Sequence, residues 1–232
     1  MKKLFLISLL LVCVTPLNAA NPKTGWYGQI LVGGNYAFPN DITFIDPNTL
    51  LVTEGDLKYT GYGQIALAVG YRFFPQFRAE AEFLLMGNRY KEITANGNTY
   101  IYATKNLNLR FEGQTNTGAV LANGIFDFVG PGMDFAPYVG AGIGYARINN
   151  SLKFYLNNQY VQGTRINDSF DTPVVQGILG AGYYLDDLTW FGLDFRYMVA
   201  QALNQSSSTE VIDQPLHVAS INLSFSGMID CW

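Results

Sequence analysis

The stretch from Pro137 to Arg147 alternates between two kinds of residue in steps of two. The apolar set comprises Val139, Ala141, Ile143 and Tyr145, and the set of small residues comprises Gly140, Gly142, Gly144 and Ala146. Successive side chains of a β-strand point to opposite faces, so this strand has one apolar face and one face almost without side chains. A soluble sandwich strand usually pairs a bulky core face with a polar outer face. An apolar outer face over a small-residue inner face is typical of a narrow membrane barrel, which lipid solvates from outside.

Seven further stretches alternate in a similar way, with apolar residues in one parity and small or polar residues in the other. They cover about residues 25–37, 59–73, 76–87, 115–128, 174–185, 188–200 and 216–226. Each provides the roughly 9–11 residues that a tilted strand needs to cross a bilayer. We therefore predict an all-β chain that forms an eight-stranded, antiparallel, up-and-down transmembrane β-barrel.

The connections between these stretches alternate in length. Three are short, namely Phe74-Pro75, Asp186-Asp187 and about seven residues around Gly130-Pro131-Gly132. Four are long, namely about residues 38–58, 88–114, 149–172 and 201–215. Outer-membrane barrels have tight periplasmic turns and long external loops, so we expect four extracellular loops and both termini in the periplasm. Within the second loop, Asn96-Gly97 predicts a hairpin that extends the strands above the membrane.

The first residues predict a cleaved secretory signal peptide. Met1-Lys2-Lys3 is basic, Leu4 to Val14 is apolar except for Ser8, and Ala19 or Ala20 offers a small residue for cleavage. A transmembrane helix needs about 20 apolar residues, and this run is shorter. We assign residues 1–19 to the signal peptide and residues 20–232 to the barrel with its loops, and we expect the protein in the bacterial outer membrane.

Charge and cysteine content exclude several classes of partner. The chain has 14 lysine and arginine residues and 18 acidic residues, and cleavage removes Lys2 and Lys3, which leaves 12 basic residues and a net charge of −6. An acidic chain is unsuited to nucleic acid. Only Cys231 remains after cleavage, which excludes an internal disulfide and a cysteine-based metal cluster. The sequence predicts no cofactor and no metal.

Strand parity places a group of charged residues inside the barrel. These are Arg72, Arg78, Glu80, Glu82, Asp127, Asp194 and Arg196. An isolated ion in so narrow an interior would be costly, whereas opposite charges compensate one another through hydrogen-bonded pairs. We therefore expect a polar network that fills the lumen. The alternative is a gated path for small solutes, although an eight-stranded barrel holds little more than its own side chains.

Aromatic residues gather near the strand ends and on the face predicted to contact lipid. They include Trp26, Tyr27, Tyr71, Phe73, Phe77, Phe126, Phe128, Tyr145, Tyr183, Phe191 and Tyr197. Membrane barrels carry such residues as girdles at the two interfaces. We expect girdle or lipid-facing positions for this group. Stacking platforms for a ligand are the alternative.

Catalytic chemistry is the next possibility, because some membrane barrels act on lipids. Acyl transfer needs a nucleophile within hydrogen-bonding reach of a base. His217 is the only histidine, and Ser220 is the nearest serine on its strand. Residues three apart on a strand face opposite sides, so these two cannot form a catalytic pair. We predict that the protein is not an enzyme.

The sequence Pro-Tyr-Val-Gly-Ala-Gly-Ile-Gly-Tyr-Ala, together with the other strands, resembles the opacity-protein/OmpA-type family of small outer-membrane β-barrels. The resemblance covers about residues 25–226. It implies a monomeric surface antigen-like protein that acts as an adhesin through its loops. Its expected partners are outer-membrane lipid and lipopolysaccharide, the barrel assembly machinery, and a host or matrix ligand. The alternatives are a purely structural role in membrane integrity, an OmpW-like small-solute channel and, after these, a lipid-modifying barrel enzyme.

Overall fold

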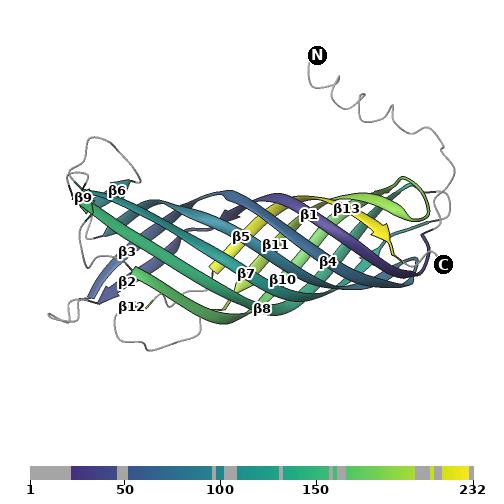
Figure 1. Ribbon diagram of the computed structural model, residues 1–232, viewed down its shortest axis with the longest axis horizontal. Helices are drawn as coiled ribbons and strands as arrows, with labels where there is room; N and C mark the ends of the chain where they lie inside the picture. The colour runs from purple at the N-terminus through teal and green to yellow at the C-terminus, as the bar shows by residue number, and fades with distance from the viewer. Residues whose placement is uncertain are drawn as a thin grey trace, which may run out of the picture.

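The computed structural model is a closed β-barrel (Figure 1). It describes residues 22–45, 52–95, 98–101, 109–130, 133–156, 159–160, 166–201, 210–211 and 216–229. The wall consists of eight long strands: β1 (Gly25–Ala37), β4 (Tyr62–Phe74), β5 (Phe77–Ala95), β7 (Leu109–Asp127), β8 (Phe135–Leu156), β10 (Ile166–Tyr184), β11 (Thr189–Ala200) and β13 (Leu216–Met228). Each pairs antiparallel with the next long strand, and β13 closes the wall by pairing with β1. The predicted eight-stranded up-and-down barrel is confirmed. The predicted signal peptide, residues 1–19, lies outside the described residues.

The two ends of the barrel differ in their connections. The turn end holds the three short connections, residues 75–76, 128–134 and 185–188. The opposite end, called the loop end below, holds the longer connections. Figure 1 shows the start of β1 and the end of β13 at the turn end, on the right. The predicted alternation of short and long connections is therefore found along the chain.

Asp186 organises the turn between β10 and β11. Its Oδ1 accepts hydrogen bonds from the backbone N–H groups of Leu188 and Thr189 and from the Thr189 hydroxyl, at 2.8, 2.6 and 2.8 Å. These donors, with the Leu188 N–H first, hold the pKa of the Asp186 carboxyl below its ordinary value. A carboxylate that accepts three hydrogen bonds from its own turn stabilises the turn locally.

The wall extends further toward the loop end than the alternation predicts. β1 has the predicted bounds, but β5, β7, β8 and β10 continue into segments predicted to be loops. Short strands add to this end: β2 (Asn40–Ile45), β3 (Val52–Thr60), β6 (Asn98–Ile101), β9 (Gln159–Tyr160) and β12 (Glu210–Val211). β3 precedes β4 and pairs with β5, while β2 pairs with β3. The prediction of loops over most of 38–58 and 149–172 is wrong, whereas the hairpin predicted around Asn96-Gly97 is found as the pairing of β5 with β6.

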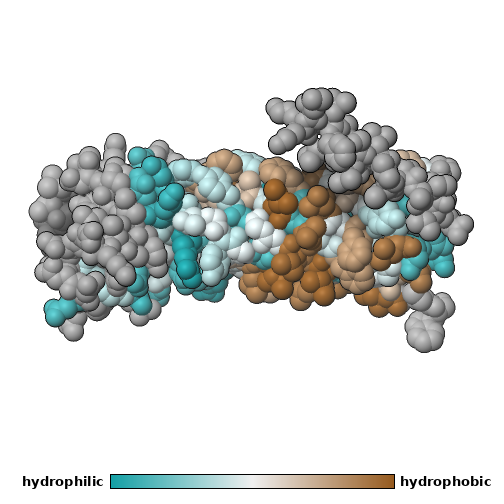
Figure 2. All heavy atoms as spheres, turned by 90° about the horizontal axis from the view of Figure 1, so that it is seen from above, coloured by the Kyte–Doolittle hydropathy of each residue, from teal (hydrophilic) through white to brown (hydrophobic). Residues whose placement is uncertain are grey.

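The outer surface carries an apolar band on the half nearer the turn end. Figure 2 shows this band in brown, with white and teal residues toward the loop end. Side chains within the band, such as Ile143 and Leu223, are 68% and 67% exposed. A contiguous apolar surface of this size is unfavourable in water but is solvated by lipid in a bilayer. Among the described residues, no helix is long and apolar enough to cross a membrane.

Aromatic rings line the band near the turn end. Trp26 packs edge-on against Tyr71 with ring centres 5.3 Å apart, and Tyr71 packs against Phe73 at 5.0 Å. Such rows match the girdles of membrane barrels. The girdle prediction is wrong for Tyr27, whose side chain is fully buried inside the barrel. Tyr27 follows Trp26 in the strand and therefore points to the opposite face.

Glycines on the inner face leave room for large side chains on the neighbouring strands. A Cβ at Gly180 would lie 2.5 Å from Cζ of Tyr138, and a Cβ at Gly70 would lie 2.3 Å from Cζ of Tyr27. Both approaches are much shorter than van der Waals contact. On the outer face of the same strand as Gly180, a Cβ at Gly177 would have no heavy atom within 4 Å. Gly70 and Gly180 are thus required by packing, and Gly177 is not.

We expect Gly180→Ala to destabilise the folded barrel by about 1–3 kcal/mol, because the added methyl group displaces the Tyr138 ring. Gly177→Ala adds the same group to open space on the same strand. It should leave stability unchanged or raise it slightly, since glycine is unfavourable inside a strand. Urea unfolding of the refolded barrels, followed by tryptophan fluorescence, compares them. Equal stability of the two variants would contradict this packing.

Candidate functional site in the barrel interior

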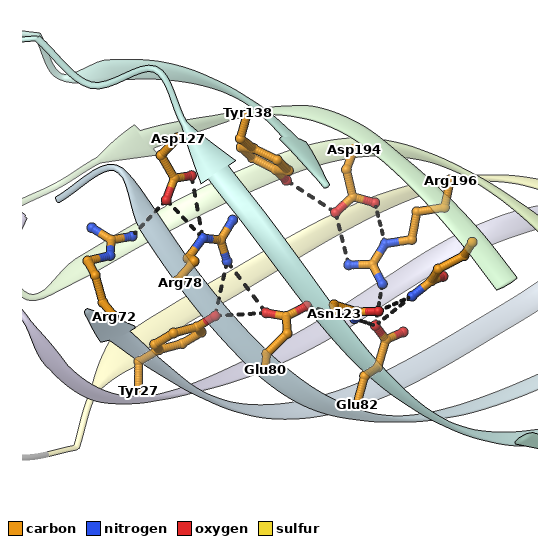
Figure 3. A network of polar contacts seen from close by, with 11 residues as sticks. Tyr27, Arg72, Arg78, Glu80, Glu82, Asn123, Asp127, Tyr138, Asp194 and Arg196 are labelled. Carbon is orange, nitrogen blue, oxygen red and sulfur yellow. Dashed lines mark hydrogen bonds and ion pairs between the residues drawn. The ribbon is translucent and has the colours of Figure 1, made fainter. Parts of the chain in front are cut away.

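Charged side chains from four strands converge inside the barrel (Figure 3). Arg72 comes from β4, Asp127 from β7, and the remaining ones from β5 and β11, namely Arg78, Glu80, Glu82, Asp194 and Arg196. Each is at most 4% exposed. The structure therefore places all seven residues of the predicted interior group in the lumen, where the closure of the sheet brings distant strands together.

The group nearest the turn end is built around Arg78. Its Nε lies 3.0 Å from Oδ2 of Asp127, and its Nη1 lies 3.5 Å from Oε2 of Glu80. The Tyr27 hydroxyl donates to Glu80 at 2.8 Å and accepts from Nη1 of Arg78 at 3.3 Å. Arg72 places a second guanidinium 3.6 Å from Asp127. Two cations thus hold two carboxylates, with a neutral hydroxyl between them.

A second group is built around Arg196. Its Nε lies 3.0 Å from Oδ1 of Asp194, and its Nη1 forms an ion pair with Glu82. Asp194 also accepts from the Tyr138 hydroxyl at 3.2 Å and from Nδ2 of Asn222 at 2.9 Å. Each carboxylate of this group therefore has a charged donor, and Asp194 has neutral donors as well.

Asn123 joins the two groups. Its Nδ2 donates to Glu80 at 3.1 Å and to Glu82 at 2.6 Å, and its Oδ1 accepts from Nε2 of Gln176 at 2.7 Å. Glu80 belongs to the first group and Glu82 to the second. One amide side chain therefore makes them a single network, which Figure 3 shows as a continuous row of contacts.

Arg72 is held mainly by aromatic faces. Its guanidinium carbon lies 4.6 Å from the ring centre of Trp190 and 5.4 Å from that of Tyr184. Among the described residues, its Nε and Nη2 have no hydrogen-bonding partner. Cation–π attraction strengthens when the partners are desolvated, so the two rings and Asp127 together stabilise this charge.

The network is nearly balanced in charge. Three guanidinium groups face four carboxylates, so one negative charge is in excess when every carboxylate is ionised. Neutral donors, including Tyr27, Tyr138 and Asn123, point at these carboxylates and offset the excess. Apart from two Arg72 nitrogens, the charged groups of the network are hydrogen-bonded to one another or to these neutral donors, which favours a fixed arrangement. Among the described residues, no group of three or more His, Cys, Asp or Glu could hold a metal ion.

Toward the loop end the interior becomes mainly apolar, with buried polar residues such as Asn88 and Thr117 among the apolar ones. On the inner face of β5, Glu82 is followed by Leu84 and Met86, and on β11 Arg196 is followed by Met198. All eight long strands contribute to this buried cluster, with Leu31, Ala66, Leu84, Leu121, Ala146, Val174, Met198 and Val218 among its members. The cluster therefore spans the cross-section of the barrel, and an aqueous path would have to pass between packed apolar side chains.

The neutral members of the network are harder to find from sequence than the charged ones. Tyr138 shares its parity with Gly140 and Gly142, and Asn123 shares its parity with Asp127. Inner-face parity is the signal that identifies both residues. Tyr27 carries the same signal, since it is two residues from Gln29 on the inner face of β1.

His217 and Ser220 lie on opposite sides of β13, as their spacing predicts. Ser220 is buried inside the barrel. His217 is on the outer side, where its Nδ1 lies 2.8 Å from the Tyr197 hydroxyl. The histidine and this serine are therefore separated by the wall itself.

The fold has known counterparts. A family described as "Outer membrane protein beta-barrel domain" matches residues 4–226. No curated protein matches the chain. Among solved structures, Neisserial surface protein A is 15% identical over 88% of this chain and 97% of that chain, with a TM-score of 0.51. The outer membrane protein OprG from Pseudomonas aeruginosa is 14% identical over 90% and 99%, with a TM-score of 0.54. At such identities the likeness concerns the fold alone.

We expect Arg196→Ala to lower the free energy of unfolding by about 3–5 kcal/mol, because Glu82 and Asp194 would keep their buried charges without the guanidinium. Lys58→Ala is the matched control. Lys58 lies 2.8 Å from Glu92, but the pair is exposed, so its removal should have little effect. Urea unfolding in detergent measures both variants. Equal free energies of unfolding for Arg196→Ala and Lys58→Ala would show that the network does not stabilise the barrel.

Proposed function

Since the chain belongs to the outer membrane protein β-barrel domain family, we propose that it is a surface protein whose loop end faces outward and contacts partners at the cell surface. In this role it acts as an adhesin or surface antigen. The barrel is the scaffold that anchors this end in the outer membrane, and it takes no part in transport or catalysis.

A reversal of polarity along the strands supports this proposal. Within the apolar band, β7 turns Val120 outward and Asn123 inward. Nearer the loop end the same strand turns Gln114 outward and Phe111 inward, and Phe111 is buried. An apolar interior beneath a polar surface is the arrangement of a β-structure in water. This change along β7 is expected of a strand that leaves the membrane and continues in the aqueous phase.

The projecting part is a hydrogen-bonded sheet. β8 continues beyond Arg147 to Leu156, which at about 3.3 Å per residue and a tilt of about 40° corresponds to roughly 20 Å. β7 pairs with β8 up to Leu109 opposite Leu156, and β10 pairs with it from Ile166 opposite Leu152. A rigid sheet holds exposed side chains in fixed positions, as a binding surface requires.

The outer face of the projecting wall carries charges of both signs. Lys58 donates to Glu92 at 2.8 Å, and this hydrogen bond raises the pKa of the Lys58 ammonium group. Glu112 pairs across the strands with Lys153 and accepts from the Tyr155 hydroxyl at 3.2 Å. Mixed charge with tyrosine suits contact with a polar partner such as a protein or a glycan.

The other functions considered for this fold have less support. The apolar layer across the lumen is unfavourable for a solute channel, and the separation of His217 from Ser220 is unfavourable for acyl transfer. A purely structural role in membrane integrity would use the same barrel without a partner. An attachment experiment separates this role from the proposed one.

We expect attachment to disappear when the projecting wall is shortened. Arg89 is opposite Gln114, and Asn150 is opposite Asp168, so each pair can be joined by Asn-Gly in place of residues 90–113 and 151–167. The apolar band keeps its ladder, so folding and insertion should persist, as checked by heat-modifiable gel mobility. Adhesion of producing cells to epithelial cells and to immobilised glycans is the measurement.

A matched control shortens a loop-end connection outside the wall of β5, β7, β8 and β10, which carries only the two-residue strand β12 paired with β2. Ala200 is opposite Leu216, so residues 201–215 can also be replaced by Asn-Gly. Cells with this variant should attach as cells with the unchanged protein do. If cells with the unchanged protein attach no better than cells without it, the adhesin role is wrong and the structural role remains.

We expect the purified protein to show no steady conductance in planar bilayers. The apolar layer leaves ions no hydrated path, and the charges below it are engaged with one another. Single-channel recording at neutral pH and high salt is the measurement. A large, stable conductance from a preparation that is fully folded by gel mobility would favour the channel instead.

A further inference from the structure

A groove crosses the outer wall where the apolar band ends on β4, β5, β7 and β8. Its volume is about 650 Å³. Ile65 and Leu85 line its apolar side, while Asn116, Arg147 and Asn149 line its polar side. The groove therefore combines the two kinds of surface that meet at the edge of a membrane.

The strand register places these groups in two adjacent rows. The first row runs across the strands through Leu85, Gly118 and Arg147, and the second through Gly87, Asn116 and Asn149. One row nearer the turn end, Val120 pairs with Tyr145 and both are exposed apolar residues. The change from lipid-facing to polar surface thus occurs within the groove.

Glycines form the floor of the groove, and internal packing does not require them. A Cβ at Gly118 would approach nothing closer than Cδ2 of Leu85 at 3.6 Å. A Cβ at Gly87 would lie 3.4 Å from Oδ1 of Asn116 and 3.5 Å from Cδ1 of Tyr62. These are ordinary contacts, in contrast to the clash at the inner-face Gly180. The missing side chains leave space only on the outside of the barrel.

Two arginine side chains, Arg147 and Arg89, lie near the rim of the groove. Arg147 is weakly engaged, because its Nε lies 3.9 Å from Asp171 and the arginine side chain is 66% exposed. The Arg89 guanidinium lies 4.8 Å from the Tyr62 ring centre and donates to the Tyr62 hydroxyl at 3.2 Å. Arg89 also borders a smaller polar cleft, of about 260 Å³, which Lys153 and Glu112 help to line. Exposed pairs such as Arg147 with Asp171 are readily exchanged for a stronger anion.

We propose that this groove is a binding site for a lipid A molecule of the outer leaflet. An acyl chain lies along Ile65, Leu85 and the glycine floor, and a phosphate group accepts hydrogen bonds from Arg147. The amides of Asn116 and Asn149 are on the same side and can donate to the same headgroup. Three properties of the groove fit lipid A: its apolar floor, its cationic rim and its position at the edge of the apolar band.

The inference rests on the orientation in which the loop end faces outward, and it is independent of any partner at the loop end. Lipid A is the outer-leaflet lipid that brings acyl chains and phosphate to this level. A folded protein partner would have to enter the lipid phase to reach Leu85 and Ile65, which favours a lipid as the occupant.

The test uses protein refolded in a zwitterionic detergent and titrated with bis-phosphorylated lipid A. Binding to the folded state raises the unfolding temperature in a concentration-dependent way, which gives an apparent affinity. Arg147→Gln should weaken this affinity about tenfold, as expected for loss of one charge-assisted hydrogen bond. Gly118→Leu fills the groove and should weaken it to a similar extent, without altering the interior.

Matched controls separate the groove from general effects of charge and size. Gly177→Leu adds the same side chain to open space on the outer face of β10, and Lys58→Gln removes an exposed cation outside the groove. Both should bind lipid A as the unchanged protein does. The proposal is overturned if dephosphorylated lipid A stabilises the protein equally, or if Gly118→Leu binds lipid A as tightly as Gly177→Leu. Loss of attachment by cells with the shortened wall tests the proposed surface role and does not test the lipid A site.

Discussion

A closed wall of eight strands leaves an interior that only its own side chains can fill, and the rest of the structure follows from this constraint. Bulk water cannot solvate a buried carboxylate there, so each charge has to find protein donors. Arg78 and Arg196 supply most of the compensation, and Asn123 connects their two groups. The cost of an isolated buried ion is several kcal/mol, so the network has to be complete before it is favourable. The polar interior is thus a consequence of barrel size and of the charges that the sequence places there.

The same constraint explains where glycine is needed and where it is optional. Inside, a ring such as Tyr138 fits only because Gly180 on the adjacent strand has no side chain. Outside, Gly118 has free space above it, so its lack of a side chain shapes a surface. Composition alone cannot distinguish these two roles. The distinction appears only when parity and register are known, because the same residue type serves packing on one face and a groove on the other.

The membrane-spanning part of the fold can be predicted from the sequence, since lipid outside and small or polar residues inside give every strand the same signal. For β1 the predicted bounds, Gly25 and Ala37, are those of the structure. The projecting part could not be predicted in this way. On β8 the apolar parity changes, from Ile143 outside to Ile148 and Leu152 inside, so the expected pattern ends near Arg147 although the strand continues. The charged residues of the interior could be predicted from parity, whereas their partners required the register between strands that are distant in sequence.

The change of parity indicates that one part of the sheet contacts lipid and the other part contacts water. Where lipid surrounds the wall, the apolar surface faces out and hydrogen bonds fill the interior. Where water surrounds it, the apolar residues turn inward, and Tyr90, Phe111 and Ile148 form part of a conventional buried core. This core and the apolar cluster across the lumen are one continuous buried cluster, and on the inner face of β5 its member Leu84 follows Glu82 of the charged network. The apolar filling of the lumen and the extended sheet then have one physical origin, because the same buried cluster packs beneath both. A wide aqueous channel through this chain would require the loss of that core, which makes a fixed surface and an open pore competing uses of the same strands.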